Sequence, residues 1–178
     1  MLLPFRRSFQ SQFSVRSATS FSLRKLVEEV FVSGSPALHG QQQAVETTID
    51  VPSNLTIVAN RKLIRRAMEQ LMRHAIAAMP DGGTLTVTGI AGRDAVELEI
   101  ANTGESLSDD ARLHVFDPSR DEPHGPAVWL RNADGREMAA VHRIAELHGG
   151  DVTVANCPEG GVAFTLRIPR PRNLEAAA

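Results

Sequence analysis

The chain has 178 residues, of which 42% are hydrophobic and 22% charged, and its formal net charge is −2. That length is enough for one domain with a sizeable core, and that charge creates no field that would attract nucleic acid or an acidic membrane. The single cysteine, Cys157, excludes an internal disulfide and suits a reducing compartment, so we expect a cytoplasmic protein. No stretch approaches the roughly 18 apolar residues that a membrane span needs, so none is expected.

The two ends of the chain differ in composition from the part between them. Residues 1–20 carry three arginines, five serines, one threonine and no acidic residue. We interpret this segment as a flexible linker from a longer protein, and a targeting segment is the alternative. Residues 171–178 end in an alanine-rich run and are expected to form a disordered tail. The folded domain is therefore predicted over residues 21–170.

The first elements along the chain are a helix and two strands. Apolar residues at helical spacing follow Ser22, a suitable N-cap, and predict a helix over 21–38. A polar, glutamine-rich loop comes next. Apolar and polar residues then alternate from Val45 to Val51, which is typical of a strand, and a second short strand is predicted over 55–59.

A long helix and a hairpin follow. Asn60 is a good N-cap for a helix over 61–79, which has a continuous apolar stripe and stops at Pro80. Two strands, predicted over 84–90 and 95–101, are separated by a short glycine-containing turn that is typical of a hairpin.

The rest of the chain predicts two more helices around a long irregular segment. A short helix over 107–116 is expected to be capped by Ser108. The segment 117–134 is rich in polar residues and proline, and we interpret it as a lid. A second long helix is predicted over 135–148, with Gly149 as its C-cap. Two closing strands are predicted over 151–156 and 162–168.

This order of elements predicts an α/β fold with two layers. Several strand pairs are linked by hairpins, so the sheet should be mixed and mainly antiparallel. The helices should cover one face of that sheet, which gives a two-layer α/β sandwich.

Several segments, in order along the chain, resemble the motifs of the histidine-kinase-type ATPase domain, a member of the GHKL superfamily with gyrase-type and Hsp90-type ATPases. The resemblance implies a Bergerat-type ATP-binding fold, ATP or ADP with Mg²⁺ as ligands, and a response regulator or a histidine kinase as protein partner. The matching segments are the entry helix Phe21–Val30, the end of the N-box Ala75–Gly83, the G1-box Ile100–Gly104, the F-box Phe116–Pro118, the helix segment Ile144–Gly150 and the closing strand Gly161–Pro169.

The N-box departs from the family at two positions one helical turn apart. His74 stands where the family has an asparagine that binds Mg²⁺, and Mg²⁺ prefers oxygen ligands over an imidazole nitrogen. His74 is therefore a doubtful metal ligand, and a partly buried helix residue is the other interpretation. Gln70 stands where the wider superfamily places a glutamate general base, and an amide cannot take a proton from water. No catalytic residue is assigned with certainty.

The G1-box and the G2-box also depart from the family. Asn102 replaces an aspartate that accepts a hydrogen bond from adenine, whereas Thr103 and Gly104 are retained and suit a close approach of the base. Asn102 can also be read as a strand-end residue in a turn. The second G1 glycine has become Ser106. In the G2-box, the family's glycines present backbone N–H groups to phosphates, and the residues in this chain are Gly135, Arg136 and Glu137.

These departures lead to a functional expectation with two alternatives. We expect the ATP-binding domain of a histidine-kinase-like signalling protein, divergent and with weak or lost nucleotide binding, in a regulatory or docking role. The first alternative is a functional Mg·ATP-binding kinase domain cut from a longer sensor kinase, and the second is a small-ligand or protein-binding module that reused the fold. None of the six histidines lies in the family's phospho-acceptor motif, and no helical hairpin fits before Phe21. Whether the chain is an enzyme therefore stays open.

Overall fold

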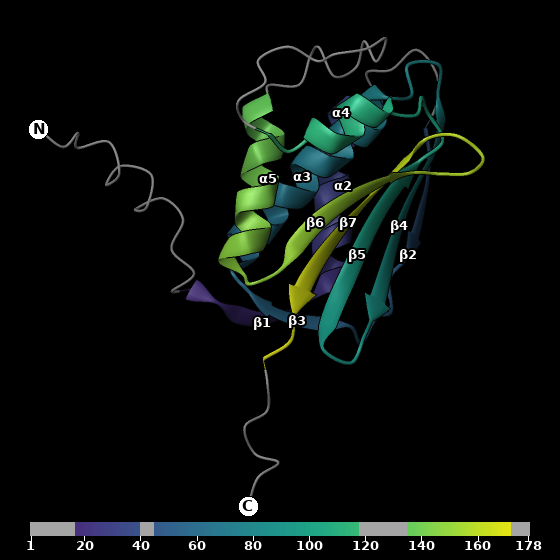
Figure 1. Ribbon diagram of the computed structural model, residues 1–178. Coiled ribbons are helices and arrows are strands. Elements are labelled where there is room, and N and C mark those ends of the chain that lie inside the picture. Colours follow the sequence, from purple (N-terminus) through teal and green to yellow (C-terminus); the bar gives the residue numbers. More distant parts are fainter. Residues whose placement is uncertain (1–16, 40–44, 118–134, 172–178) are drawn as a thin grey trace, which may run out of the picture.

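The computed structural model describes residues 17–39, 45–117 and 135–171 of the chain. Helices form one layer and a five-stranded sheet forms the other (Figure 1). The elements in chain order are β1 (Thr19–Ser22), α2 (Leu23–His39), β2 (Val45–Asp50), β3 (Thr56–Ala59), α3 (Arg61–Ala77), β4 (Gly83–Ala91), β5 (Ala95–Asn102), α4 (Asp109–His114), α5 (Gly135–Leu147), β6 (Asp151–Asn156) and β7 (Val162–Pro169).

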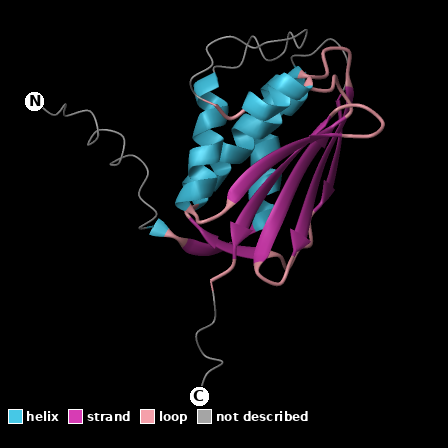
Figure 2. Cartoon of the chain, in the orientation of Figure 1, coloured by secondary structure: helices cyan, strands magenta, loops and turns pink. Residues whose placement is uncertain are grey.

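The main sheet has the strand order β2-β4-β5-β7-β6. Strands β2 and β4 are parallel, whereas the other three neighbouring pairs are antiparallel. Figure 2 shows the long helices on one side of this sheet. The predicted two-layer α/β sandwich with a mixed, mainly antiparallel sheet is thus confirmed.

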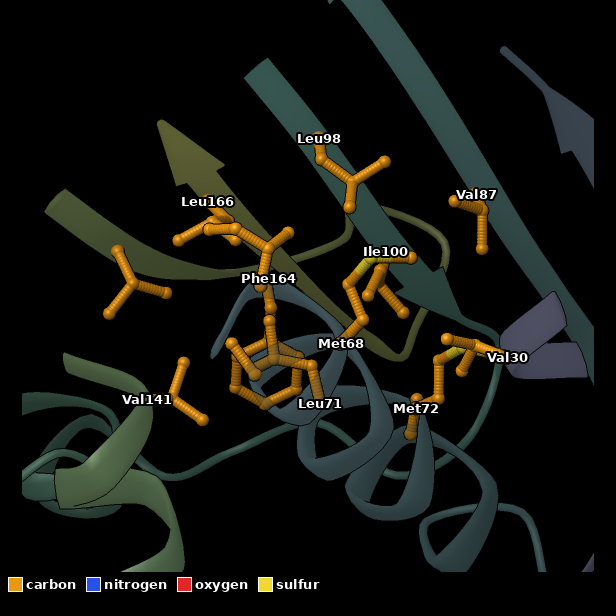
Figure 3. Packing of buried hydrophobic residues seen from close by; sticks show 14 of the residues in the cluster. Val30, Met68, Leu71, Met72, Val87, Leu98, Ile100, Val141, Phe164 and Leu166 are labelled. Atoms are coloured by element: carbon orange, nitrogen blue, oxygen red, sulfur yellow. The ribbon is translucent and has the colours of Figure 1, made fainter. Parts of the chain in front are cut away.

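The core lies between α3 and the central strands. Helix α3 contacts α2, α5 and β5, so its apolar stripe is covered on several sides. Figure 3 shows Met68 and Leu71 of α3 beside Ile100 of β5 and Phe164 of β7, and all four side chains are fully buried. Since a buried side chain of this size contributes about 1.5–3 kcal/mol, this packing fixes the position of α3 over the sheet.

Strand β1 is an element that the sequence did not predict. It pairs antiparallel with β3, from Thr19 opposite Ala59 to Ser22 opposite Thr56. Folded structure therefore begins before residue 21, where the domain was expected to start. A serine-rich and threonine-rich segment carries no apolar alternation, and its strand conformation follows from pairing with a segment distant in the sequence.

The predicted helix ends are close to those observed. Helix α3 stops at Ala77 rather than 79, and α4 covers only Asp109–His114 rather than 107–116. All three predicted N-caps are confirmed, because the Ser22, Asn60 and Ser108 side chains accept backbone N–H groups of α2, α3 and α4. The predicted lid, apart from Asp117, lies outside the described residues, as do residues 1–16 and 172–178.

The loop after β5 is tied to the end of α3. The N–H of Glu105 donates to the carbonyl of Ala78 at 3.2 Å, and the N–H of Thr84 donates to Oγ1 of Thr103 at 2.9 Å. These bonds bring the N-box and G1-box segments together. In the part of the chain that the structure describes, no helix has the length and hydropathy needed to cross a membrane.

Candidate functional site

Helix α3 supplies the first side chains of the site. Its start is fixed by Asn60, whose Oδ1 accepts the N–H groups of Lys62 and Leu63. Gln70 and His74 lie one turn apart, so they share a face of the helix. The Oε1 atom of Gln70 is buried and has no hydrogen-bond partner among the described residues.

His74 is a buried, uncharged residue at neutral pH. Only 2% of it is exposed. Burial, with a smaller contribution from the positive charge of Arg73, lowers the pKa of His74 to about 4. The His74 imidazole is therefore neutral, and it belongs to the core rather than to the surface.

Asn102 lies at the end of β5 and is 3% exposed. Its Oδ1 accepts the N–H of Gly104 at 2.9 Å, which fixes the orientation of the amide. The Nδ2 atom is buried and has no hydrogen-bond partner within the described residues. Both interpretations of Asn102 thus have a basis, because the residue forms a turn and retains a free donor.

Thr103 and Gly104 make intramolecular contacts. The Thr103 hydroxyl oxygen accepts the N–H of Thr84. A Cβ atom added to Gly104 would lie 2.1 Å from the carbonyl oxygen of Ala78, so a larger residue would force the loop away from α3. These contacts explain why the loop needs these two residues, independently of any ligand.

Ser106 and Asn156 attach the same loop to the β6–β7 hairpin. The Ser106 hydroxyl donates to the carbonyl of Gly161 at 3.3 Å. Asn156 accepts the N–H of Leu107 at 3.0 Å and donates to the carbonyl of Leu107 at 2.7 Å. The sequence analysis missed Asn156, since its partner lies 49 residues away and no local pattern indicates the pairing.

Helix α5 brings the G2-box residues to α3. Gly135 and Arg136 begin α5, and the Arg136 side chain is exposed. Glu137 in the first turn accepts from Arg73 of α3, with Nη1 and Oε1 3.4 Å apart. An exposed ion pair of this kind adds little stability. The position of this ion pair matters more than its strength. It holds the Glu137 carboxylate at the N-terminus of α5, beside the helix that carries His74.

His148 is a second residue whose role the sequence did not reveal. Its Nε2 accepts the N–H of Asn60 at 3.0 Å, and its Nδ1 donates to the carbonyl of Ile144 at 2.8 Å. These two bonds require the neutral ring with the proton on Nδ1. His148 therefore connects the end of α5 to the N-cap of α3 and has a structural role.

The residues at the N-box do not fit Mg²⁺. Mg²⁺ takes oxygen ligands in octahedral geometry, whereas His74 presents a buried imidazole. Among the described residues, no group of three or more histidine, cysteine or acidic side chains could hold a metal ion. The adenine side of the site is also altered, because Oδ1 of Asn102 already accepts the N–H of Gly104 and the atom without a partner among the described residues is the donor Nδ2, which cannot accept from an amino group.

A family model described as histidine kinase-, DNA gyrase B-, and HSP90-like ATPase matches residues 59–172. The sensor protein CreC of Escherichia coli is 29% identical over 119 residues, which are 67% of this chain and 24% of CreC. The adaptive-response sensory kinase SasA of Nostoc sp. is 30% identical over 133 residues, 71% of this chain and 31% of SasA. The chain thus spans 24% and 31% of the lengths of these two relatives.

Solved structures share the fold. The catalytic domain of the histidine kinase ThkA matches with a TM-score of 0.74 and 21% identity, over 86% of this chain and 98% of that one. Full-length ShkA in complex with AMPPNP matches with a TM-score of 0.73 and 23% identity, over 88% of this chain and 32% of that one. ThkA in complex with the response regulator TrrA matches with a TM-score of 0.67 and 21% identity, over 86% of this chain and 42% of that one.

Proposed function

The chain belongs to the histidine kinase-, DNA gyrase B- and HSP90-like ATPase family, and from this membership we propose that it is an ATP-binding domain with a divergent nucleotide site. In this proposal the domain serves a histidine-kinase-like signalling protein, binds Mg·ATP weakly or not at all, and acts by regulation or docking. Its partner is a response regulator or a histidine kinase, and its compartment is the cytoplasm.

The observation that carries the proposal is the state of His74. A side chain that is 2% exposed and neutral cannot reorganise cheaply to meet a hydrated dication. The imidazole also lacks the oxygen that Mg²⁺ prefers. The position most specific for metal-bound nucleotide in the family is therefore occupied by a group suited to the protein core.

Glu137 supports the proposal from a different element. A carboxylate in the first turn stabilises α5 through the helix dipole, but it repels a triphosphate at the same end. The ion pair with Arg73 keeps it next to α3. If His74, Asn102, Ser106 and Glu137 each cost about 1–2 kcal/mol of binding, the affinity for nucleotide falls about 10³-fold or more.

Calorimetric titration of the full chain tests the proposal. ADP and a nonhydrolysable ATP analogue are titrated with and without Mg²⁺, and weak or absent heat of binding is expected. Micromolar, Mg²⁺-dependent binding would refute the proposal. The double variant His74→Asn/Glu137→Gly should bind nucleotide more tightly than the wild type. The matched control His142→Asn/Glu146→Gly makes the same replacements at partly exposed positions of α5 outside the N-box and should leave the nucleotide affinity unchanged.

The second candidate function is a working Mg·ATP-binding domain of a longer sensor kinase. One observation favours it: Gln70 and Asn102 each retain a buried polar atom with no hydrogen-bond partner among the described residues. Buried polar groups without partners are uncommon, and a bound ligand is one way to satisfy them. The same titration separates the two candidates. An Asn102→Leu variant that abolishes measurable nucleotide binding would support this second function.

A further inference from the structure

A groove with three arginine side chains lies at the end of the sheet that is remote from Asn102. Its walls come from β3, the turn between β4 and β5, and the end of β7, which meet at the lower edge of the molecule in Figure 1. Strand β5 runs from this turn to Asn102 over eight residues, so the groove is about 25 Å from Asn102. The residues that line it include Val58 of β3, Arg93 and Asp94 of the turn, and Arg167, Ile168 and Arg170 at the end of β7.

We propose that this groove binds an acidic, extended segment of a partner protein. The proposal does not rest on nucleotide binding, because none of the lining residues belongs to the nucleotide site. It rests on three observations: the positive charge of the groove, the hydrogen bond that joins its two rims (the end of β7 and the β4–β5 turn), and the apolar residues that form its floor.

The charge of the groove is opposite to that of the whole chain. Arg93, Arg167 and Arg170 against Asp94 leave a local charge of +2, whereas the formal net charge of the protein is −2. Arg167 is partly engaged, with its Nε 3.8 Å from Oε1 of Glu97. Within the described residues, no ion pair engages Arg93 or Arg170. Two exposed guanidinium groups therefore remain available for carboxylates.

The rims of the groove are held together by the fold. The N–H of Arg170 donates to the carbonyl of Asp94 at 2.9 Å, which ties the end of β7 to the β4–β5 turn. Arg93 and Arg170 therefore project from backbone segments that are bonded to each other. Such preorganisation reduces the entropy cost of binding.

The apolar residues beneath the groove, and the edge of β3 that faces away from β1, favour an extended peptide. Ile57, Val96 and Ile168 are buried beneath the groove, whereas Val58 is 44% exposed at its surface. Strand β3 pairs with β1 and with no other strand among the described residues. A peptide along β3 can therefore place apolar side chains near Val58 and acidic side chains near the arginines.

Nucleic acid fits the groove less well than a peptide. Among the described residues that line the groove, none has an aromatic side chain on which a base could stack. Asp94 lines the groove and Glu97 lies beside Arg167, so a continuous row of phosphates would meet two carboxylates. Spaced carboxylates on an extended chain avoid that conflict.

Fluorescence anisotropy with the full chain tests the proposal. The probe is a fluorescein-labelled peptide of about eight residues in which glutamate alternates with valine, and the control probe has lysine in place of glutamate. The glutamate probe should bind and the lysine probe should not. The double variant Arg93→Glu/Arg170→Glu should weaken binding at least about tenfold. Arg143→Glu, at an exposed position of α5, is the matched control and should bind like the wild type.

Val58→Thr separates a peptide site from simple attraction of anions, because it makes the exposed side chain polar without adding charge or changing its size. It should weaken binding of the glutamate probe, and serine in place of valine in the probe should have the same effect. Equal binding by wild type and the arginine double variant, with circular dichroism showing both folded, would overturn the proposal. Tighter, arginine-dependent binding of a single-stranded DNA oligonucleotide would overturn it as well and identify a nucleic-acid site.

Discussion

Acidification should destabilise this domain through His74. The folded protein holds the pKa of His74 at about 4, against 6.5 for an exposed histidine. The unfolded chain therefore binds a proton at a pH where the folded protein does not. The contribution of His74 to stability is complete above about pH 6.5 and is lost as the pH falls toward 4.

The size of this effect follows from the difference in pKa. A shift of about 2.5 units corresponds to about 3 kcal/mol at and below pH 4, since each unit is worth about 1.4 kcal/mol. At pH 5 the same relation gives about 2 kcal/mol. Such a loss is a large part of the stability of a typical domain.

Urea unfolding at pH 8 and pH 5, followed by circular dichroism, measures this loss. Other groups titrate in the same range, so the comparison is between the wild type and His74→Asn, which carries no titratable group. The wild type should lose about 2 kcal/mol more than the variant between the two pH values. His142→Asn removes a partly exposed imidazole that stacks on Phe116, and this variant should retain the pH dependence of the wild type. If His74→Asn loses stability as steeply as the wild type, the interpretation of His74 as a buried neutral core residue is wrong.

Three further predictions concern the contacts around the site. His148→Ala removes the acceptor for the N–H of Asn60 and should lower the free energy of unfolding by about 1–3 kcal/mol at neutral pH, measured by urea titration. Gly104→Ala places a Cβ 2.1 Å from a backbone oxygen and should lower the melting temperature by several degrees or prevent folding, and a variant with an unchanged melting temperature would contradict the described loop. Burial, with a smaller contribution from Glu99, raises the pKa of Cys157, so its reaction with a thiol reagent at pH 8 should be slower than that of a free thiol, and Glu99→Gln should accelerate it.

The sequence predicted most of the fold because the relevant signals are local. Asn60 as an N-cap and the apolar stripe of α3 follow from residues within a few turns of each other, and both are confirmed. Strand β1 was missed because its conformation depends on pairing with β3, whose residues lie between 34 and 40 positions away. Neither the hydrophobic periodicity nor the strand propensity of residues 19–22 indicates which distant strand they pair with.

The candidate site was predictable only as a set of positions. The resemblance located Gln70, His74 and Asn102, but not how buried His74 and Asn102 are or which atoms remain without partners. The role of Asn156 in holding Leu107, and that of His148 in holding Asn60, depend on contacts between segments 49 and 88 residues apart. Side-chain chemistry can be read from a sequence, whereas long-range pairing requires the folded chain.

The retained and the altered parts of the family motifs have different physical roles. Gly104 and Thr103 are retained, and each makes contacts inside the protein that hold the loop to the end of α3. His74 and Glu137 depart from the family, yet each suits the protein itself, one as a core residue and the other as a partner of Arg73. These internal contacts do not involve a ligand. They support the proposed divergence of the nucleotide site within a backbone that the family shares.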